Sequence, residues 1–183
     1  MRDGCAGRRG HIIVPSSSFM PIATPSARVL ILGSLPGRVS LARGEYYALA
    51  QNAFWRIMGH LFGAGPELHY ADRVERLRRC RVAVWDVCAS ARRAGSLDSA
   101  IDRKSIEPND FAGFFSRHPH IRLIGVNGGT AGRLYERLVR PGLDAASRKI
   151  PLVGLPSTSP AHAAMPYDRK LAAWRIVKLH ADP

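Results

Sequence analysis

The sequence predicts an α/β fold in three layers, α/β/α, with a central four-stranded, mainly parallel sheet. Two observations predict it. Short apolar runs alternate with segments of helical periodicity along most of the 183 residues. The alternation is typical of a parallel sheet that helices cover on both faces. With 46% hydrophobic residues, the chain can bury the core of one domain.

The predicted elements follow one another in a regular order. Strands are expected over residues 28–32, 82–87, 121–126 and 150–154, each a run of apolar residues. Helices are expected over residues 53–62, 70–79 and 108–117, from the third strand through residue 139, and over residues 167–179. Residues 1–25 are rich in Gly, Pro and Ser and are expected to form a flexible arm. Residues 26–183 are expected to form a single domain.

The charge of the chain points to a polyanionic partner. The formal net charge is +13, and nucleic acid is the first candidate for a partner. Most basic residues are arginine, which a GC-rich genome also favours without any selection for binding. No segment is long enough to span a membrane, and the basic start has too short an apolar run for a signal peptide.

Cysteine usage favours a reducing compartment. Cys5, Cys80 and Cys88 are odd in number and lack the spacing of paired ligands. A disulfide framework, a zinc site and an iron–sulfur site are therefore not expected. We expect no metal and no cofactor. A cytoplasmic, nucleoid-associated bacterial protein fits this pattern, and nothing in the sequence demands more than a monomer.

Polar and aromatic residues gather just after the predicted strands. The carboxyl ends of parallel strands meet at one edge of the sheet, where ligands of such folds bind. Amide side chains can pair with the edge of a base, aromatic rings can stack on it, and hydroxyls can hold phosphates. Together they suit a pocket for one extruded nucleotide. The residues in question are Ser34, Ser40, Tyr46, Tyr47, Asn52, Asp86, Ser90, Asn127, Ser157, Thr158, Ser159 and His162.

Each of these residues also has a purely structural interpretation. Tyr47 can be an ordinary half-buried aromatic residue. Asn52 and Asn127 can each cap the helix that follows. Asp86 can bond nearby amides, and "PSTSP" can be a plain polar turn. Only because these polar and aromatic residues are expected to meet at one edge of the sheet do they indicate a site.

Four blocks of the sequence resemble the uracil-DNA glycosylase superfamily, and most of all its hypoxanthine-DNA (deoxyinosine) glycosylase branch. The blocks are "LILGSLPGRVSLARGEYYALAQNAFWRIMG", "VWDVCASARRAGSLDSAI", "IGVNGGTA" and "LPSTSPAHAAMPYDRKLAAW". They run over residues 28–174, and the first and last are the specific ones. The resemblance implies a uracil-DNA glycosylase-like fold and a partner that is DNA containing deaminated bases.

Within the first block the resemblance assigns roles residue by residue. Tyr47 falls where an aromatic ring stacks on the extruded base. Leu35 stands where many members carry the acid or amide that orients the attacking water, a task that leucine cannot perform. In the hypoxanthine branch the asparagine of "NAFW", here Asn52, is implicated instead, and the asparagine of "VNGG", Asn127, pairs with the base. The motif positions matched are Gly33, Pro36, Gly37, Ser40, Tyr47, Asn52, Phe54 and Trp55.

The last block resembles the superfamily's second motif, with an inserting loop over residues 160–166. Pro156 and Ser157 match. Leu155 stands where a His or Asn often stabilises the departing base. His162 is a surrogate for that group, a phosphate contact, a side chain inserted into the groove, or an exposed loop residue.

The implied reaction is hydrolysis of an N-glycosidic bond through a transition state with oxocarbenium character. Main-chain N–H groups near Gly33, Ser34 and Leu35, with Asn127, stabilise the leaving base. Asn52 holds the water, and Asp86 is the nearest acid if a base is needed. With no lysine expected at the site, lyase chemistry is not expected and a monofunctional enzyme is favoured. Phosphate contacts are expected from Ser40, Ser157, Thr158, Ser159, His162, Arg38, Arg43, Arg92 and Arg93.

The substrate and the activity itself have alternatives. Uracil and hypoxanthine both present a carbonyl next to an N–H, so we expect activity on both, and on xanthine. A catalytically inactive DNA-binding module of the same fold is favoured by Leu35 and Leu155. A nucleoside hydrolase acting on small molecules is the third possibility.

Overall fold

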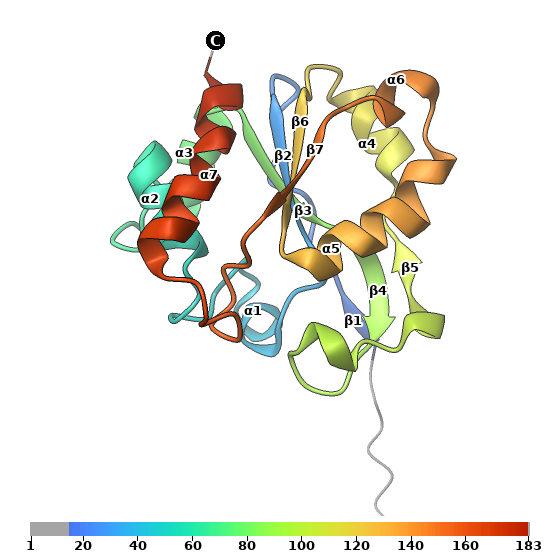
Figure 1. The fold of residues 1–183 in the computed structure, drawn as a ribbon, viewed down its shortest axis with the longest axis horizontal. Coiled ribbons are helices and arrows are strands. Elements are labelled where there is room, and N and C mark those ends of the chain that lie inside the picture. The colour runs from blue at the N-terminus through green and yellow to red at the C-terminus, as the bar shows by residue number, and fades with distance from the viewer. Residues whose placement is uncertain (1–14, 183) are drawn as a thin grey trace, which may run out of the picture.

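The computed structural model describes residues 15–182, and its centre is a four-stranded parallel sheet (Figure 1). The strand order is β3-β2-β6-β7, and every neighbouring pair is parallel. The predicted fold class is confirmed. Each predicted strand begins and ends within three residues of the corresponding observed strand. The strands are β2 (Val29–Gly33), β3 (Val82–Asp86), β6 (Leu123–Asn127) and β7 (Leu152–Leu155).

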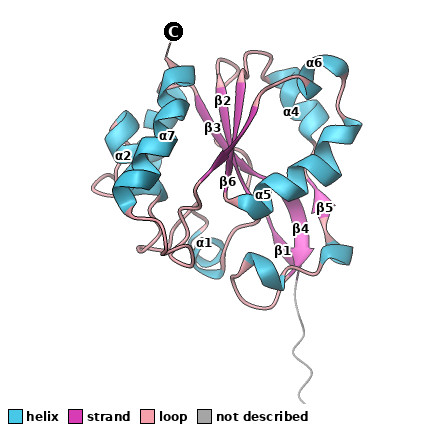
Figure 2. Ribbon diagram, viewed as in Figure 1, coloured by secondary structure: helices cyan, strands magenta, loops and turns pink. Residues whose placement is uncertain are grey.

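Helices cover both faces of this sheet (Figure 2). On one face lie α2 (Phe54–Phe62), α3 (Tyr70–Arg79) and α7 (Tyr167–Ala181). On the other lie α4 (Phe111–Arg117), α5 (Gly129–Leu134) and α6 (Ala145–Arg148). The chain after α5 continues as a π-helical turn over Tyr135–Val139 and a 3₁₀ turn over Arg140–Gly142.

Apolar periodicity explains how these helices attach. Helix α2 buries Phe54, Trp55, Ile57 and Met58 on one side, and Gly63 ends it in the left-handed conformation. Trp174 of α7 is completely buried and packs edge-on against Phe54, with ring centroids 6.0 Å apart. Large apolar side chains therefore join two helices that are far apart in the sequence.

A second, smaller sheet lies beside the carboxyl edge of the main one. It consists of β1 (Pro15–Ser17), β4 (Cys88–Arg92) and β5 (Glu107–Pro108), all antiparallel, in the order β1-β4-β5. Strand β4 follows β3 almost directly. Sequence analysis did not predict this sheet, because its strands are short and pair over long distances in the chain.

The expectation of a flexible arm is wrong for residues 15–25. Strand β1 pairs with β4, and Ile22, only 4% exposed, forms a bridge to Val84. Pairing with β4 and burial of Ile22 order this segment despite its Gly/Pro/Ser-rich composition. Residues 1–14 of the expected arm, including Cys5, lie outside the described residues.

The remaining short elements surround the carboxyl edge. Helix α1 (Arg38–Arg43) follows the turn after β2, and 3₁₀ turns cover Asp98–Ala100 and Arg103–Ser105. In Figure 1 these segments lie below the sheet, at its carboxyl edge. None of the helices over residues 15–182 has the length and apolar character required to cross a membrane.

Candidate active site

A cavity of about 370 Å³ opens at the carboxyl edge of the parallel sheet. Its walls come from the turn after β2, the start of α1, the ends of β3 and β6, and the loop after β7. The structure brings most of the predicted site residues together, and Arg43, Ser90, Arg92 and Arg93 do not line the cavity. Those in the cavity wall are Gly33, Ser34, Leu35, Ser40, Tyr47, Asn52, Asp86, Asn127, Ser157, Thr158, Ser159 and His162.

Asp86 is the buried acid of this cavity. It is the last residue of β3 and only 3% exposed. Ser18 Oγ donates to its Oδ2 over 3.2 Å, and Asn109 Nδ2 donates to its main-chain carbonyl over 2.9 Å. Burial, and to a lesser extent the charge of Asp98, raise the pKa of the Asp86 carboxyl to about 7 against the opposing effects of the Ser18 hydrogen bond and of Arg93. Asp86 can therefore release or accept a proton near neutral pH.

Gly33 allows Asp86 and Tyr47 to approach the turn after β2. A Cβ atom on Gly33 would lie 2.4 Å from Asp86 Oδ1 and 3.0 Å from the Tyr47 hydroxyl oxygen. Any larger residue at position 33 would displace the carboxyl. The close approach of backbone and side chain explains the glycine.

Tyr47 presents a hydroxyl that no described residue satisfies. Its ring stacks on Phe54, with centroids 3.9 Å apart and planes at 21°, so one face of the ring is already covered. The hydroxyl is buried and has no hydrogen-bond partner among the described residues. Burial raises the Tyr47 pKa, which keeps the hydroxyl neutral. Because buried polar groups are nearly always paired, this hydroxyl is available to a ligand.

The two asparagines of the site combine structural and binding capacity. Asn127 donates to Thr158 Oγ1 over 2.8 Å and accepts from the Thr158 N–H over 2.9 Å. Asn52 Oδ1 accepts from the Phe54 N–H over 3.0 Å, but the N-cap of α2 is Ala53, so Asn52 is not the capping residue that one interpretation predicted. Asn127 does not cap α5, whose N-cap is Gly128. Among residues 15–182, one N–H of Asn127 and both N–H groups of Asn52 have no hydrogen-bond partner and can serve a ligand.

The hydroxyls predicted to contact phosphates are mostly used within the protein. Ser40 is buried, and its Oγ accepts from the Ala48 N–H over 3.2 Å. Ser157 and Ser159 each accept from an N–H two residues onward, at 3.2 Å. Thr158 is 1% exposed and bonds to Asn127. These hydroxyls shape the loops around the cavity.

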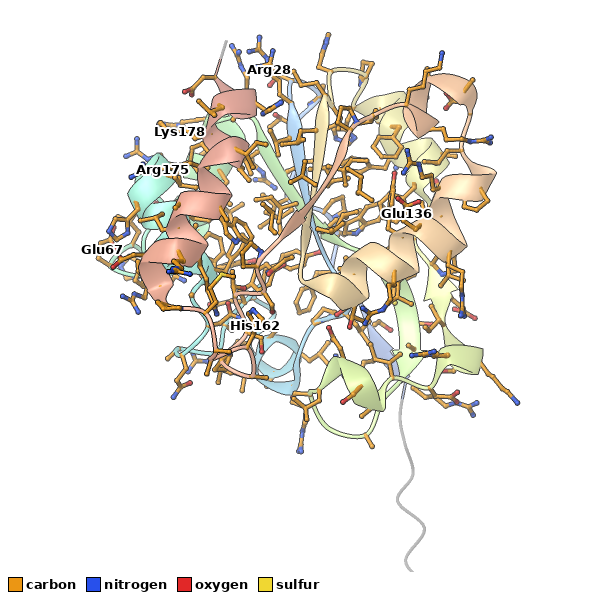
Figure 3. All side chains as sticks on the ribbon, in the orientation of Figure 1. Arg28, Glu67, Glu136, His162, Arg175 and Lys178 are labelled. Atoms are coloured by element: carbon orange, nitrogen blue, oxygen red, sulfur yellow. The ribbon has the colours of Figure 1, made fainter. Side chains whose placement is uncertain are left out.

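His162 is an exposed residue of the loop after β7, as Figure 3 shows. Its carbonyl accepts from Lys170 Nζ over 2.8 Å. Lys170 belongs to the fourth block of the sequence, contrary to the expectation of no lysine there. It is 6% exposed, does not line the cavity, and burial lowers its pKa. Its observed role is to hold the loop.

Asp98 and Arg93 are the residues that the sequence analysis missed or placed wrongly. Ser34 Oγ donates to Asp98 Oδ1 over 2.6 Å, and Asp98 lines the cavity. Arg93 was expected at phosphates but is 6% exposed, and its guanidinium donates to the carbonyls of Leu35, over 3.3 Å, and Pro36. The signal for both was present in "RRAGSLD", an arginine pair and an acid shortly after a predicted strand.

The donor set of the cavity is that of an organic ligand. Over residues 15–182, no group of three or more His, Cys, Asp and Glu side chains is arranged to hold a metal ion. The wall instead combines two acids, two amides, a tyrosine hydroxyl and several serines with apolar surface. Such a mixture can recognise a flat, polar molecule.

Comparison with known proteins agrees with this geometry. The model of the Uracil DNA glycosylase superfamily matches residues 20–178. A hypoxanthine DNA glycosylase of Methanosarcina acetivorans is 35% identical over 163 residues, 88% of this chain and 97% of the relative. A hypoxanthine DNA glycosylase of Methanosarcina barkeri is 36% identical over 123 residues, 67% of this chain and 76% of the relative.

A solved structure shows the same fold. It is the solution NMR structure of a candidate uracil DNA glycosylase from Methanosarcina acetivorans, with a TM-score of 0.75 and 32% identity over 92% of this chain and 99% of that one. The chain therefore belongs to the uracil DNA glycosylase superfamily. It is an enzyme of the DNA glycosylase class, a hydrolase of N-glycosyl bonds.

Proposed function

We propose that this chain is a monofunctional DNA glycosylase that removes deaminated bases from DNA and so starts base excision repair. Hypoxanthine is the first substrate, with uracil and xanthine as further ones. The proposal is supported above all by one observation: a cavity of about 370 Å³, with Asp86 buried in its wall, opens where the parallel strands end. The names of the sequence relatives support the same substrate class.

The cavity suits a base that has left the double helix. An enzyme that acts on the glycosidic bond of a paired base must extrude the nucleotide into a pocket. The net charge of +13 attracts the phosphate backbone that carries the base. Exposed Arg38 and Arg43, on α1 beside the cavity, are placed to contact that backbone.

Recognition of the base falls to the groups that the fold leaves free. Hypoxanthine, uracil and xanthine each present a carbonyl next to an N–H. The free N–H of Asn127 and the unpartnered hydroxyl of Tyr47 can donate to such a carbonyl, and a cavity acid can accept the N–H. The pairing that the resemblance implies for Asn127 uses only its one free N–H.

Asp86 is proposed to exchange the proton that the reaction requires. Departure of the base places negative charge on it, and a neutral carboxyl can neutralise that charge. A pKa of about 7 keeps Asp86 half protonated at neutral pH. General acid–base catalysis of this kind contributes about 10²–10⁴-fold in rate.

Water is proposed as the nucleophile, which makes the enzyme monofunctional. No lysine lines the cavity among the described residues, and Lys170 Nζ bonds to the carbonyl of His162. An amine nucleophile would have to reach the sugar to form an imine. We also propose that the enzyme acts as a monomer.

The test is a cleavage assay on duplex oligonucleotides that carry a single hypoxanthine, uracil or xanthine. Alkali treatment reveals abasic sites. We expect cleavage by the wild type and a loss of about 100-fold or more in Asp86→Asn. Asp102→Asn is the matched control, because Asp102 is an exposed acid paired with Arg92 outside the cavity.

Two outcomes would contradict the proposal. Binding without cleavage of any deaminated base indicates an inactive module, in agreement with the apolar Leu35 and Leu155. Turnover of free deoxyinosine in preference to the oligonucleotide indicates a nucleoside hydrolase.

A further inference from the structure

We infer that Asp98 is a catalytic residue that accepts a proton from the attacking water, the task that Leu35 cannot perform. The inference rests on the proposed function and names a group for a step that the function leaves open. The attacking water needs a side chain in the cavity that can accept its proton. Among residues 15–182, the acids that line the cavity are Asp86 and Asp98.

Asn52, predicted to hold the water, and Asn127, predicted to pair with the base, have side-chain oxygens that are already occupied. Asn127 Oδ1 accepts from the Thr158 N–H, and Asn52 Oδ1 accepts from the Phe54 N–H. An amide oxygen can orient a water but is too weak a base to take its proton. Leu35 is 6% exposed and its side chain joins the hydrophobic core. The acceptor must therefore come from another segment.

Asp98 has one bound and one free oxygen at the cavity. Its Oδ1 accepts from Ser34 Oγ over 2.6 Å, while Oδ2 has no hydrogen-bond partner among the described residues. The side chain is 39% exposed, so a water can reach it. Ser34 directly precedes Leu35 in the turn after β2. The carboxylate thus lies beside the position that leucine leaves without an acceptor.

Arg93 forms an ion pair with this carboxylate. Its guanidinium has a side-chain exposure of 1% and lies 3.9 Å from Asp98 Oδ1. It also donates to the carbonyls of Leu35 and Pro36. A single buried cation therefore holds both the Asp98 loop and the turn after β2. Such a fork of fixed donors suits a preorganised site.

The loop that carries Asp98 is closed at its base and docked at its tip. An isolated β-bridge joins Arg93 to Ile101, and the Arg38 N–H at the start of α1 donates to Ser96 Oγ over 3.1 Å. Figure 1 shows this loop, in yellow-green after β4, beside α1. A catalytic acceptor needs a supported position of this kind.

The two acids of the cavity have different surroundings, which suits different roles. Asp98 is partly exposed and paired with Arg93, whereas Asp86 is buried and faces no cation within salt-bridge distance among the described residues. The water oxygen bonds to C1′ while the C1′–N bond breaks. The electron pair of the C1′–N bond leaves with the base. The proton of the water passes to Asp98 Oδ2, and the base takes a proton from the Asp86 carboxyl.

The experiment measures single-turnover cleavage of a hypoxanthine duplex by the wild type, Asp98→Asn and Asp102→Asn. Asparagine keeps an acceptor for Ser34 Oγ but removes the basic oxygen and the charge that faces Arg93, and the affinity measurement below reports whether the loop is retained. We expect the rate to fall about 100-fold or more in Asp98→Asn and by less than about threefold in Asp102→Asn. Affinity for a duplex carrying 2′-fluoro-2′-deoxyinosine, which resists hydrolysis, should change by less than about threefold.

A rate for Asp98→Asn within about threefold of the wild type would overturn the inference and leave the proposed function intact. An equal loss of rate and of affinity for the fluorinated duplex would also overturn it, because that pattern indicates a structural role. If the wild type itself cleaves no deaminated base, the proposed function fails, and the inference fails with it.

Discussion

At the scale of single residues, the cavity is built from polar groups that the fold leaves only partly satisfied. Asp86 is buried, hydrogen-bonded to Ser18, and faces no cation within salt-bridge distance in the described chain. The Tyr47 hydroxyl has no partner there. Unsatisfied buried groups reduce stability and are found where a ligand completes them. We therefore expect function and stability to oppose each other at Asp86.

The first prediction concerns the pH dependence of stability. The pKa of Asp86 is raised from 3.8 to about 7 in the folded protein, so the folded state holds a proton that the unfolded state has lost. The free energy of unfolding should therefore fall as the pH rises from about 4 to about 7, by on the order of 4 kcal/mol. Above about pH 7, the ionisation of Asp86 should no longer change the free energy of unfolding. Urea unfolding at several pH values measures the fall.

Asp86→Asn removes the titration and provides the control. The variant should lose most of this fall and be more stable than the wild type at pH 7 and above, although we expect its cleavage activity to be strongly reduced. An equally steep fall in the variant would show that another group titrates.

Residue-level interpretation of the sequence predicted residues of the cavity wall where a polar side chain stands near a strand end or a helix start. Asp86, Asn52 and Asn127 were predicted because each directly follows a strand or opens a helix. Asp98 was missed because only the β-bridge between Arg93 and Ile101 brings its loop back to the turn after β2. Such a return is not encoded in any local pattern.

At the scale of elements, the side-chain amide of Asn127 joins the end of β6 to the loop after β7. The two hydrogen bonds between Asn127 and Thr158 join the end of β6 to this loop, and the Ala53 N–H donates to the Thr158 carbonyl over 2.9 Å. Three segments of the cavity wall therefore share a single threonine. Loss of one partner should affect the whole edge.

Asn127→Ala should lower the free energy of unfolding by about 1–3 kcal/mol, because it removes two hydrogen bonds and leaves Thr158 unsatisfied in a buried position. Ser90→Ala is the matched control, since its hydroxyl donates to Glu107 at an exposed site, and should change stability by less than about 0.5 kcal/mol. Denaturant titrations compare the two. Equal, small effects would show that the Asn127–Thr158 pair does not hold the loop.

The elements themselves differ in how far the sequence determines them. Strands β2, β3 and β6 were predicted because continuous apolar runs buried on both faces need no knowledge of the partner strand. Strands β1 and β5 are short and polar, and their pairing with β4 depends on residues far away in the chain. Their stability comes from contacts, so no propensity could indicate them.

At the scale of the whole molecule, the positive charge and the cavity both suit an enzyme that acts on DNA. The net charge of +13 is spread over a chain whose cavity wall contains both acids of the site. Arg38, in the cavity wall, and Arg43, outside it at the end of α1, are proposed to attract the phosphate backbone, and the cavity is proposed to receive the base. Of these two arginines, Arg43 is thus separated in space from the residues proposed for the chemistry.

This separation predicts a strong salt dependence of binding to duplex DNA. The logarithm of the binding constant should fall linearly with the logarithm of the salt concentration, also for DNA without a deaminated base. Arg43→Ala should reduce the slope by about one unit while single-turnover cleavage of bound DNA stays unchanged. Fluorescence anisotropy at several salt concentrations gives the slope. A slope near zero would show that backbone phosphates contribute little.

The measurement that tests the central claim most directly follows the fate of the base itself. Wild-type protein is incubated with a duplex carrying one hypoxanthine, with and without borohydride, and the products are identified by mass spectrometry. We predict free hypoxanthine, an alkali-labile abasic strand and no covalent protein–DNA adduct. Intact hypoxanthine in bound DNA would contradict the assignment of a glycosylase, and an adduct trapped by borohydride would contradict hydrolysis by water.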